Sequence, residues 1–139
     1  MELLTKAQAD FPWIQSLRRQ IHRHPEHGNQ EFETAALIEG ILTGLGLKPR
    51  RLLDTAVVCD IEGAAPGKTV ALRADMDALP IQEETGLPFS SQVPGMMHAC
   101  GHDFHVAGLL GAAKLLCRAQ FSGRVRLLFQ PDEELDGGA

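Results

Sequence analysis

The sequence has no excess of basic residues, which excludes one broad class of partner. It contains 13 lysines and arginines against 18 aspartates and glutamates, so its formal net charge is -5. Nucleic acids and anionic membranes both favour a basic face, and this sequence has no basic tail. We therefore expect neither a nucleic acid nor a membrane as its partner.

The sequence also has no long apolar run and no even set of cysteines. Its best apolar run, residues 106–113, is interrupted by Gly108 and Gly111 and is far shorter than the roughly 20 residues of a membrane span. The first ten residues carry charges and no apolar segment, so we expect no signal peptide. Three widely spaced cysteines suit free or metal-bound thiols in a reducing compartment better than a disulfide framework. These absences predict a cytoplasmic protein.

The residues that are present predict one domain with a core. A chain of 139 residues is too short for two comfortable domains, and 44% of its residues are hydrophobic. Apolar residues at helical spacing predict three helices, over about residues 5–22, 30–45 and 103–119. Asn29 is the expected N-cap of the second helix.

Alternating apolar and polar residues predict strands between and after these helices. Residues 56–62 predict a half-exposed strand, and residues 69–74 predict a more apolar and therefore central one. Residues 125–129 alternate again after the third helix. A strand, a helix and a strand in succession nearly always form a right-handed parallel crossover. The pattern predicts an α/β fold with a mixed, largely parallel sheet and flanking helices.

Residues suited to chemistry gather where these elements begin and end. Asp75 and Asp77 follow the first strand of the crossover, and the pair Glu133-Glu134 follows the second. The segment Cys100-Gly101-His102 opens the helix between them. Because open α/β sheets place their sites at the carboxyl ends of strands, we expect the three groups to meet at one edge.

This combination of residue types favours a metal site. A thiolate at Cys100 and an imidazole at His102 can bind one ion around the flexible Gly101. Of two adjacent glutamates, one can bind the ion while the other moves protons. Each feature alone has an ordinary explanation: a small buried cysteine, a solvated acidic loop or turn-forming aspartates. Their joint occurrence at one edge is what favours a metal.

The remaining histidines and cysteines carry less weight. His105 lies one turn into the third helix, where it is placed to donate a hydrogen bond to the site. Three histidines surround the end of the first helix and are expected to be exposed or to cap it: His22, His24 and His27. Cys59 and Cys117 lie on apolar stripes and are expected in the core.

Four stretches of the sequence resemble one family of enzymes in order and spacing. They read L-R-R-Q-I-H-R-H-P-E, then A-L-R-A-D-M-D-A-L-P, then M-H-A-C-G-H-D-F-H with L-L-G-A-A-K-L-L behind it, and finally V-R-L-L-F-Q-P-D-E-E. The chain resembles the metal-dependent amidohydrolases, the family of aminoacylases, hippurate hydrolases and auxin-conjugate (IAA-amino acid) hydrolases. The resemblance spans nearly the whole chain.

The resemblance implies a zinc-exopeptidase-like catalytic domain with two divalent ions, zinc or manganese, about 3.5–4 Å apart. By motif, three residues would bind metal: Cys100, His102 and Glu134. Glu133 would be the general base that deprotonates the attacking water, and Asp75 would orient a metal-binding histidine from behind. No residue is expected to bind an organic cofactor.

The resemblance also implies a reaction. The enzyme would hydrolyse the amide bond of a small N-acyl or N-aroyl amino acid with a water activated by two metal ions. A metallo-exopeptidase or dipeptidase is the nearest alternative, because it would use nearly the same site. A non-catalytic metal- or redox-responsive fragment is the alternative from another class, because a metal-free Cys100 could form a reactive thiolate.

Members of this family continue well past the glutamate pair. Residues 1–139 would therefore be the N-terminal portion of a truncated catalytic domain, without its remainder and without the lid and dimerisation domain. We expect such a chain to be inactive alone and to form a homo-oligomer. Three departures from the family pattern remove no ligand: Phe104 in place of a small residue, Asp132 in place of alanine and Leu135 in place of glycine.

Overall fold

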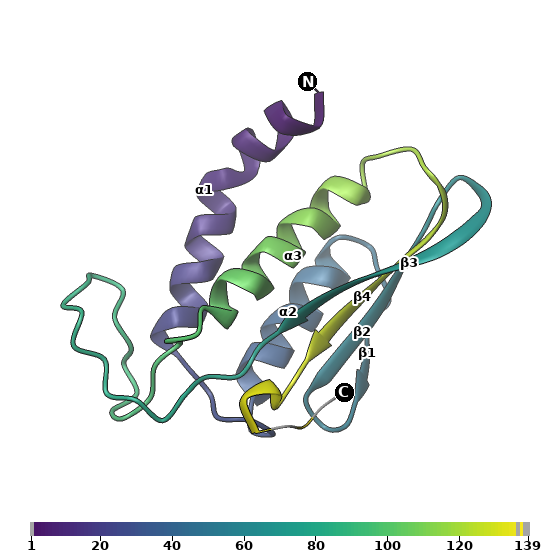
Figure 1. Ribbon diagram of the computed structural model, residues 1–139. Coiled ribbons are helices and arrows are strands. Elements are labelled where there is room, and N and C mark those ends of the chain that lie inside the picture. The colour runs from purple at the N-terminus through teal and green to yellow at the C-terminus, as the bar shows by residue number, and fades with distance from the viewer. Residues whose placement is uncertain (1, 136, 138–139) are drawn as a thin grey trace.

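The computed structural model describes residues 2–135 and 137 and consists of one sheet with three helices beside it (Figure 1). The elements follow the chain in this order: α1 (Glu2–Arg23), α2 (Phe32–Gly44), β1 (Arg50–Leu52), β2 (Ala56–Glu62), β3 (Ala65–Asp75), α3 (His102–Leu116), β4 (Ser122–Gln130) and the short 3-10 helix η1 (Glu133–Leu135). The three predicted helices and three predicted strands are all present, and no pattern in the sequence predicted the short β1.

The sheet is mixed and has the strand order β1-β2-β4-β3. β3 and β4 are parallel and α3 connects them, which confirms the predicted crossover. β2 is antiparallel to both β1 and β4. The mixed α/β class is confirmed, but the expectation of a largely parallel sheet is wrong for these strands, because β3 with β4 is the one parallel pair among them.

The positions of β2 and β3 in the sheet are the reverse of those predicted. β2 is an inner strand and most of its residues are buried, whereas β3 is an edge strand and is exposed over most of its length. Val70 of β3 has 56% of its surface exposed. The apolar content of a strand shows that it can be buried, but its place depends on the insertion of β4 between β2 and β3.

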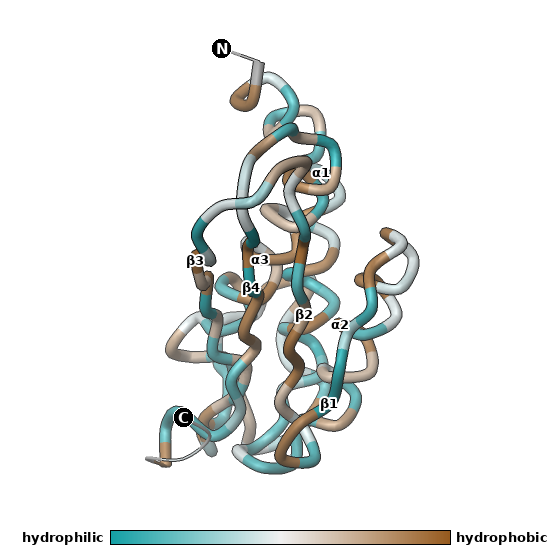
Figure 2. Tube along the Cα trace, turned by 90° about the vertical axis from the view of Figure 1, so that its right-hand side faces the viewer, coloured by the Kyte–Doolittle hydropathy of each residue, from teal (hydrophilic) through white to brown (hydrophobic). Residues whose placement is uncertain are grey.

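The core lies between the helices and one face of the sheet. Leu17 and Ile21 of α1 pack with Ile38 of α2, Leu110 of α3 and Phe129 of β4. Full burial of such a side chain stabilises the fold by about 1.5–3 kcal/mol. Figure 2 shows the other face of the sheet, which the helices leave open. No helix in the described part of the chain combines the length and the apolar content needed to cross a membrane.

The start of α2 differs from the prediction. Asn29 is not the N-cap: its φ of 60° places it in the left-handed region, which asparagine tolerates. The cap residue is Glu31, and the first turn is held by the carboxylate of Glu26. That carboxylate accepts the backbone N–H groups of Glu33 at 2.9 Å and Thr34 at 2.7 Å. The carboxylate of Glu26 therefore satisfies the free N–H groups at the start of α2 from outside the helix.

The two cysteines predicted in the core have different positions. Cys59 of β2 is 1% exposed, which confirms its prediction. Cys117 is exposed, and its prediction is wrong. α3 ends at Leu116, so Cys117 is the C-cap residue and no longer follows the apolar stripe of the helix.

The long segment between β3 and α3, residues 76–101, is held by two isolated β-bridges. Leu79 and Met97 pair across it as an isolated antiparallel bridge, and His27 pairs with Ala78. In Figure 1 this segment extends past the first turn of α3. Both of its ends lie at the edge of the sheet where α3 begins, while its middle projects away from the sheet.

Candidate metal centre

Three segments supply the candidate site, as the sequence predicted. Asp75 ends β3, Cys100 and His102 lie at the start of α3, and Glu133 and Glu134 form the first turn of η1. Ligand atoms of Cys100, His102 and Glu134 all lie within 4.8 Å of one another. The fold thus brings together the three residues that the sequence analysis named as metal ligands.

His102 is held in one orientation and one tautomer. Its side chain is 2% exposed, and its Nδ1 lies 3.0 Å from the backbone oxygen and 3.1 Å from Oδ1 of Asp77. Both oxygens accept, so Nδ1 carries a proton, and Nε2 is the ring nitrogen left to bind a cation. Gly101 precedes His102 at φ 90°, a left-handed conformation that glycine adopts at no steric cost. The imidazole is therefore prepared to bind a cation through Nε2.

The free nitrogen of His102 faces three carboxylates. Nε2 lies 3.6 Å from Asp75 Oδ1, 3.7 Å from Glu133 Oε2 and 3.7 Å from Glu134 Oε1. These distances exceed a hydrogen bond, and Glu134 Oε1 is buried with no partner among the described residues. Two atoms that bind one tetrahedral zinc ion at about 2.1 Å lie roughly 3.4 Å apart. The donors present therefore fit a divalent cation, which would offset the clustered negative charge.

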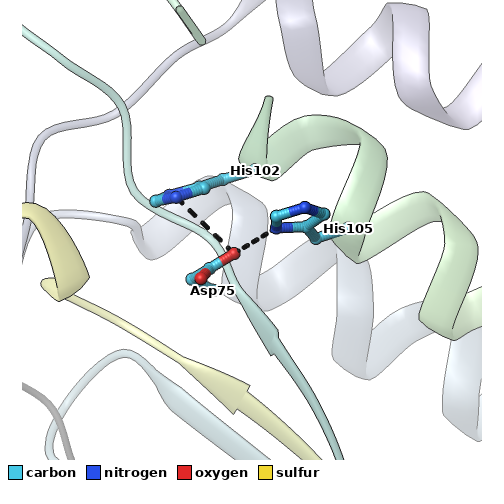
Figure 3. A group of neighbouring side chains, drawn as sticks. All are labelled: Asp75, His102 and His105. Carbon is cyan, nitrogen blue, oxygen red and sulfur yellow. Dashed lines mark hydrogen bonds and ion pairs between the residues drawn. The ribbon is translucent and has the colours of Figure 1, made fainter. Parts of the chain in front are cut away.

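Asp75 lies on the open side of His102 and not behind it (Figure 3). Its Oδ1 accepts a hydrogen bond from His105 Nδ1 at 2.5 Å, and the rings of His102 and His105 stack with centroids 5.6 Å apart. Burial raises the pKa of Asp75, but the hydrogen bond from His105 and the nearby histidines and Arg73 outweigh it, and the pKa is lowered. Asp75, His102 and His105 form a second group of possible ligands.

The residue behind His102 is Asp77, which the sequence analysis noted only as a neighbour of Asp75. Asp77 is 1% exposed and uses both carboxylate oxygens. Oδ1 accepts from His102, and Oδ2 accepts the backbone N–H of Glu134 at 2.9 Å. β3 ends at Asp75, so Asp77 lies beyond the strand. One buried carboxylate therefore aligns two candidate ligands.

Cys100 lies at the exposed rim of this group. The nearby carboxylate of Glu134, and secondly burial, raise the pKa of its thiol to about 11. In the absence of a cation, Cys100 is therefore a protonated thiol and a poor nucleophile.

A second cluster of polar side chains starts at the neighbouring residue of α3, and the sequence analysis missed it. His22 is 2% exposed, so the expectation of an exposed or capping residue is wrong for it, although His24 is exposed. His22 Nδ1 lies 2.7 Å from Asp103 Oδ2, and its Nε2 lies 3.2 Å from Glu83 Oε1. Arg18 Nε also lies 2.7 Å from Asp103 Oδ2. Each ring nitrogen of His22 has a carboxylate partner.

His98 lies close to this second cluster. It is 3% exposed, its ring centroid is 6.4 Å from that of His22, and neither ring nitrogen has a hydrogen-bond partner among the described residues. Burial lowers its pKa to about 4. His98 is therefore a neutral imidazole at neutral pH.

The functional part of the chain matches a known family model. A model of the peptidase family M20/M25/M40 matches residues 71–139. This segment contains the end of β3, all of α3 and β4, and every residue of the Cys100, His102 and Glu134 group.

Two curated relatives are similar over most of this chain. Thermostable carboxypeptidase 1 of Saccharolobus solfataricus is 51% identical over 146 residues, which cover 99% of this chain and 37% of that protein. N-acetyl-L-cysteine deacetylase of Bacillus subtilis is 54% identical over 126 residues, which cover 88% of this chain and 30% of that protein. The chain spans about a third of the length of these relatives.

A solved structure shares the architecture. The YXEP protein of Bacillus subtilis, described as a dinuclear metal binding peptidase from the M20 family, superposes with a TM-score of 0.90 at 45% sequence identity. The match covers 94% of this chain and 38% of that chain. The helix-flanked mixed sheet is therefore the arrangement found in that peptidase.

Proposed function

Because the chain belongs to the peptidase family M20/M25/M40, we propose that its function is to hydrolyse the amide bond of N-acyl or N-aroyl amino acids. The name of the Bacillus subtilis relative, N-acetyl-L-cysteine deacetylase, supports a substrate of this class. The relatives are about three times as long as this chain. We therefore assign residues 1–139 to the N-terminal part of a catalytic domain whose other residues complete the site and its lid.

One observation carries the proposal. The protonated Nδ1 of His102 is held by Asp77, while its free Nε2 faces carboxylates at 3.6–3.7 Å with no hydrogen bond between them. An imidazole nitrogen and carboxylate oxygens that converge at this spacing can bind a cation placed between them. Cys100, His102 and Glu134 would hold it, and the thiolate favours zinc while the carboxylates also accept manganese.

Other residues of the site would have distinct roles in the reaction. When bound here, a pair of divalent ions would lower the pKa of an attacking water and polarise the carbonyl of the scissile amide. Glu133, 38% exposed and 3.7 Å from His102, would take the proton from that water and pass it to the leaving nitrogen. Asp77 would orient His102, the task that the resemblance assigned to Asp75. Asp75, paired with His105, would add a carboxylate on the open side of His102.

A chimera would test the proposal. These residues would replace the matching segment of the Bacillus subtilis deacetylase, and we expect the product to hydrolyse N-acetyl amino acids or hippurate and to lose activity with a chelator. Glu133→Gln should keep its metal, measured by plasma emission spectroscopy, and lose about 10² to 10⁴ in turnover. Glu134→Gln should lose metal as well, and Glu84→Gln, an exposed glutamate, is the matched control. Equal metal content and equal turnover in both site variants would refute this division of roles.

A second candidate function is a metallo-exopeptidase, which the 51% identity with thermostable carboxypeptidase 1 favours. Residues 1–139 would be placed in both the carboxypeptidase and the deacetylase. Comparing the two chimeras separates the contribution of these residues to substrate preference from that of the rest of each relative. Cleavage of dipeptides with no cleavage of N-acetyl amino acids in both chimeras would favour this candidate. The raised pKa of Cys100 argues against a redox-responsive fragment, since such a function needs a thiolate.

A further inference from the structure

Glu31 is buried outside the ligand group and makes a contact across the whole chain. The residue is 0% exposed, and its Oε1 accepts the backbone N–H of Asp132 at 2.8 Å, across 101 positions of sequence. Burial raises the pKa of this carboxyl, and hydrogen bonds to backbone N–H groups only partly replace the lost solvent, since Oε2 has no hydrogen-bond partner among the described residues. Burying a carboxylate costs free energy unless hydrogen bonds compensate, and the backbone N–H of Asp132 supplies one such bond.

Two residues near Glu31 in sequence also contact Asp132. Asn29 Nδ2 donates to Asp132 Oδ2 at 2.6 Å, and a Cβ at Gly28 would stand 2.0 Å from Asp132 Oδ1. Residues 28–31, the Asp132 cradle, thus enclose Asp132 closely. Asp132 has φ 56°, a left-handed backbone conformation that residues other than glycine adopt uncommonly. The contacts from residues 28–31 support this conformation.

Asp132 directly precedes the two glutamates of the candidate metal centre. Glu31 fixes the backbone N–H before Glu133, and Asp77 fixes the backbone N–H after it, at Glu134. Two buried carboxylates therefore hold the turn from both sides of Glu133. The turn cannot rotate without leaving one of these carboxylates unpaired in the interior.

We infer that Glu31 is a positioning residue, which acts through the backbone of Asp132 to fix where Glu133 and Glu134 stand relative to Cys100 and His102. This inference rests on the proposed function, since it assigns roles to the two glutamates. Glu31 itself touches neither a candidate ligand nor substrate. Its effect passes through the main-chain hydrogen bond and the cradle that surrounds it.

Amide hydrogen exchange in the 139-residue chain tests the contact without any metal. In Glu31→Ala, the amides of Asp132 and Glu134 should exchange at least about tenfold faster, because the first loses its acceptor and the turn loosens. The amide of Leu127 in the core of β4 should keep its rate. Glu31→Gln retains an acceptor oxygen and should restore the slow exchange. Glu33→Ala, an exposed glutamate two positions along, is the control and should change nothing.

Cobalt titration tests the consequence for the metal centre. Co²⁺ bound through Cys100 gives a thiolate-to-metal absorption band. The intensity of this band reports the fraction of chain with bound Co²⁺, and its rise with Co²⁺ concentration gives the dissociation constant. The dissociation constant should rise about 10- to 100-fold in Glu31→Ala, the range seen for residues that orient ligands, and return in Glu31→Gln. Gly28→Ala forces Asp132 away from the opposite side and should weaken binding similarly, so the inference stays testable if Glu31→Ala does not fold.

The two readouts separate failure of this inference from failure of the proposed function. Unchanged exchange at Asp132 together with unchanged cobalt affinity, in both Glu31→Ala and Gly28→Ala, overturns the inference. A wild-type chain with no cobalt–thiolate band contradicts the metal site itself. In that case the exchange rates alone decide: faster exchange in Glu31→Ala that Glu31→Gln reverses supports positioning by Glu31, and equal rates overturn it.

Discussion

Two clusters of histidine and acidic side chains start at adjacent residues of α3 and differ in how their atoms are paired. His102 belongs to the candidate metal centre, and Asp103 belongs to the cluster with His22, Glu83 and Arg18. In the second cluster both ring nitrogens of His22 have a carboxylate oxygen within 3.2 Å. In the first, Nε2 of His102 has only carboxylate oxygens at 3.6–3.7 Å.

The comparison shows that residue type does not separate a ligand set from a structural network. Both clusters contain buried histidine and carboxylate groups. A network in which buried donors find acceptors stabilises the fold, and in the second cluster both nitrogens of His22 have carboxylate partners, although Asp103 Oδ1 has no hydrogen-bond partner among the described residues. A histidine nitrogen that faces several carboxylates beyond hydrogen-bond distance leaves room for a cation, which would offset their negative charge. The pairing of atoms, and not composition, identifies the candidate metal centre.

The largest effect should come from breaking the paired cluster. Asp103→Ala leaves His22 and Arg18 without their buried acceptor, and the free energy of unfolding should fall by about 3–5 kcal/mol. Urea denaturation followed by circular dichroism measures this change. Glu84→Ala, at an exposed glutamate, should stay within about 0.5 kcal/mol of wild type. A similarly small loss in Asp103→Ala would show that the cluster is not structural.

The same cluster should give the protein a defined sensitivity to acid. Burial raises the pKa of Glu83, but hydrogen bonds from Thr85, the backbone of Ser91 and His22 outweigh it and lower the pKa to about 2 from an ordinary value of 4.5. The ionised Glu83 therefore stabilises the fold fully above pH 4.5, and this contribution is lost as the pH falls toward 2. Over that window it amounts to about 3 kcal/mol.

Glu83→Gln tests this pH dependence, because the variant cannot titrate at this position. Its free energy of unfolding should fall less steeply than that of wild type between pH 4.5 and pH 3. Urea denaturation at several pH values gives the two slopes. Equal slopes would mean that Glu83 is not the group responsible.

The unpaired cluster should respond in the opposite way, with loss of metal and little loss of stability. Cys100→Ala removes one of three ligands and should weaken zinc binding by more than about 100-fold, the upper range for residues that only orient ligands. Because Cys100 is exposed, the metal-free variant should unfold within about 1 kcal/mol of wild type. Isothermal titration with zinc and urea denaturation measure the two quantities. Unchanged zinc affinity would remove Cys100 from the ligand set.

The smallest effect should come from Cys117→Ala, which serves as the control for Cys100→Ala. Cys117 is exposed at the end of α3, so its removal should change neither zinc affinity nor, by more than about 0.5 kcal/mol, the free energy of unfolding. The same titration and denaturation apply. A loss of 2 kcal/mol or more, as expected of a buried side chain, would restore the core position that the apolar stripe predicted.

The grouping of the candidate ligands was predictable because it follows from a topological rule. A right-handed crossover brings the ends of β3 and β4 and the start of α3 to one edge, whatever the side chains in between. The roles of Asp75 and Asp77 were not predictable, since they depend on β3 ending at Asp75 and the chain turning there. His22 was missed because its partners lie 61 and 81 positions away, at Glu83 and Asp103.

The contacts of the candidate metal centre also fix when it can form during folding. Asp77 meets His102 across 25 positions and Glu134 across 57, and Glu31 meets Asp132 across 101. Closing loops of this length costs chain entropy that only later packing returns, so such contacts form slowly. A chain that has formed only its helices has no complete binding site for an ion. Metal binding at this centre would therefore belong to the final step of folding, and an ion bound there would stabilise the native chain without guiding its collapse.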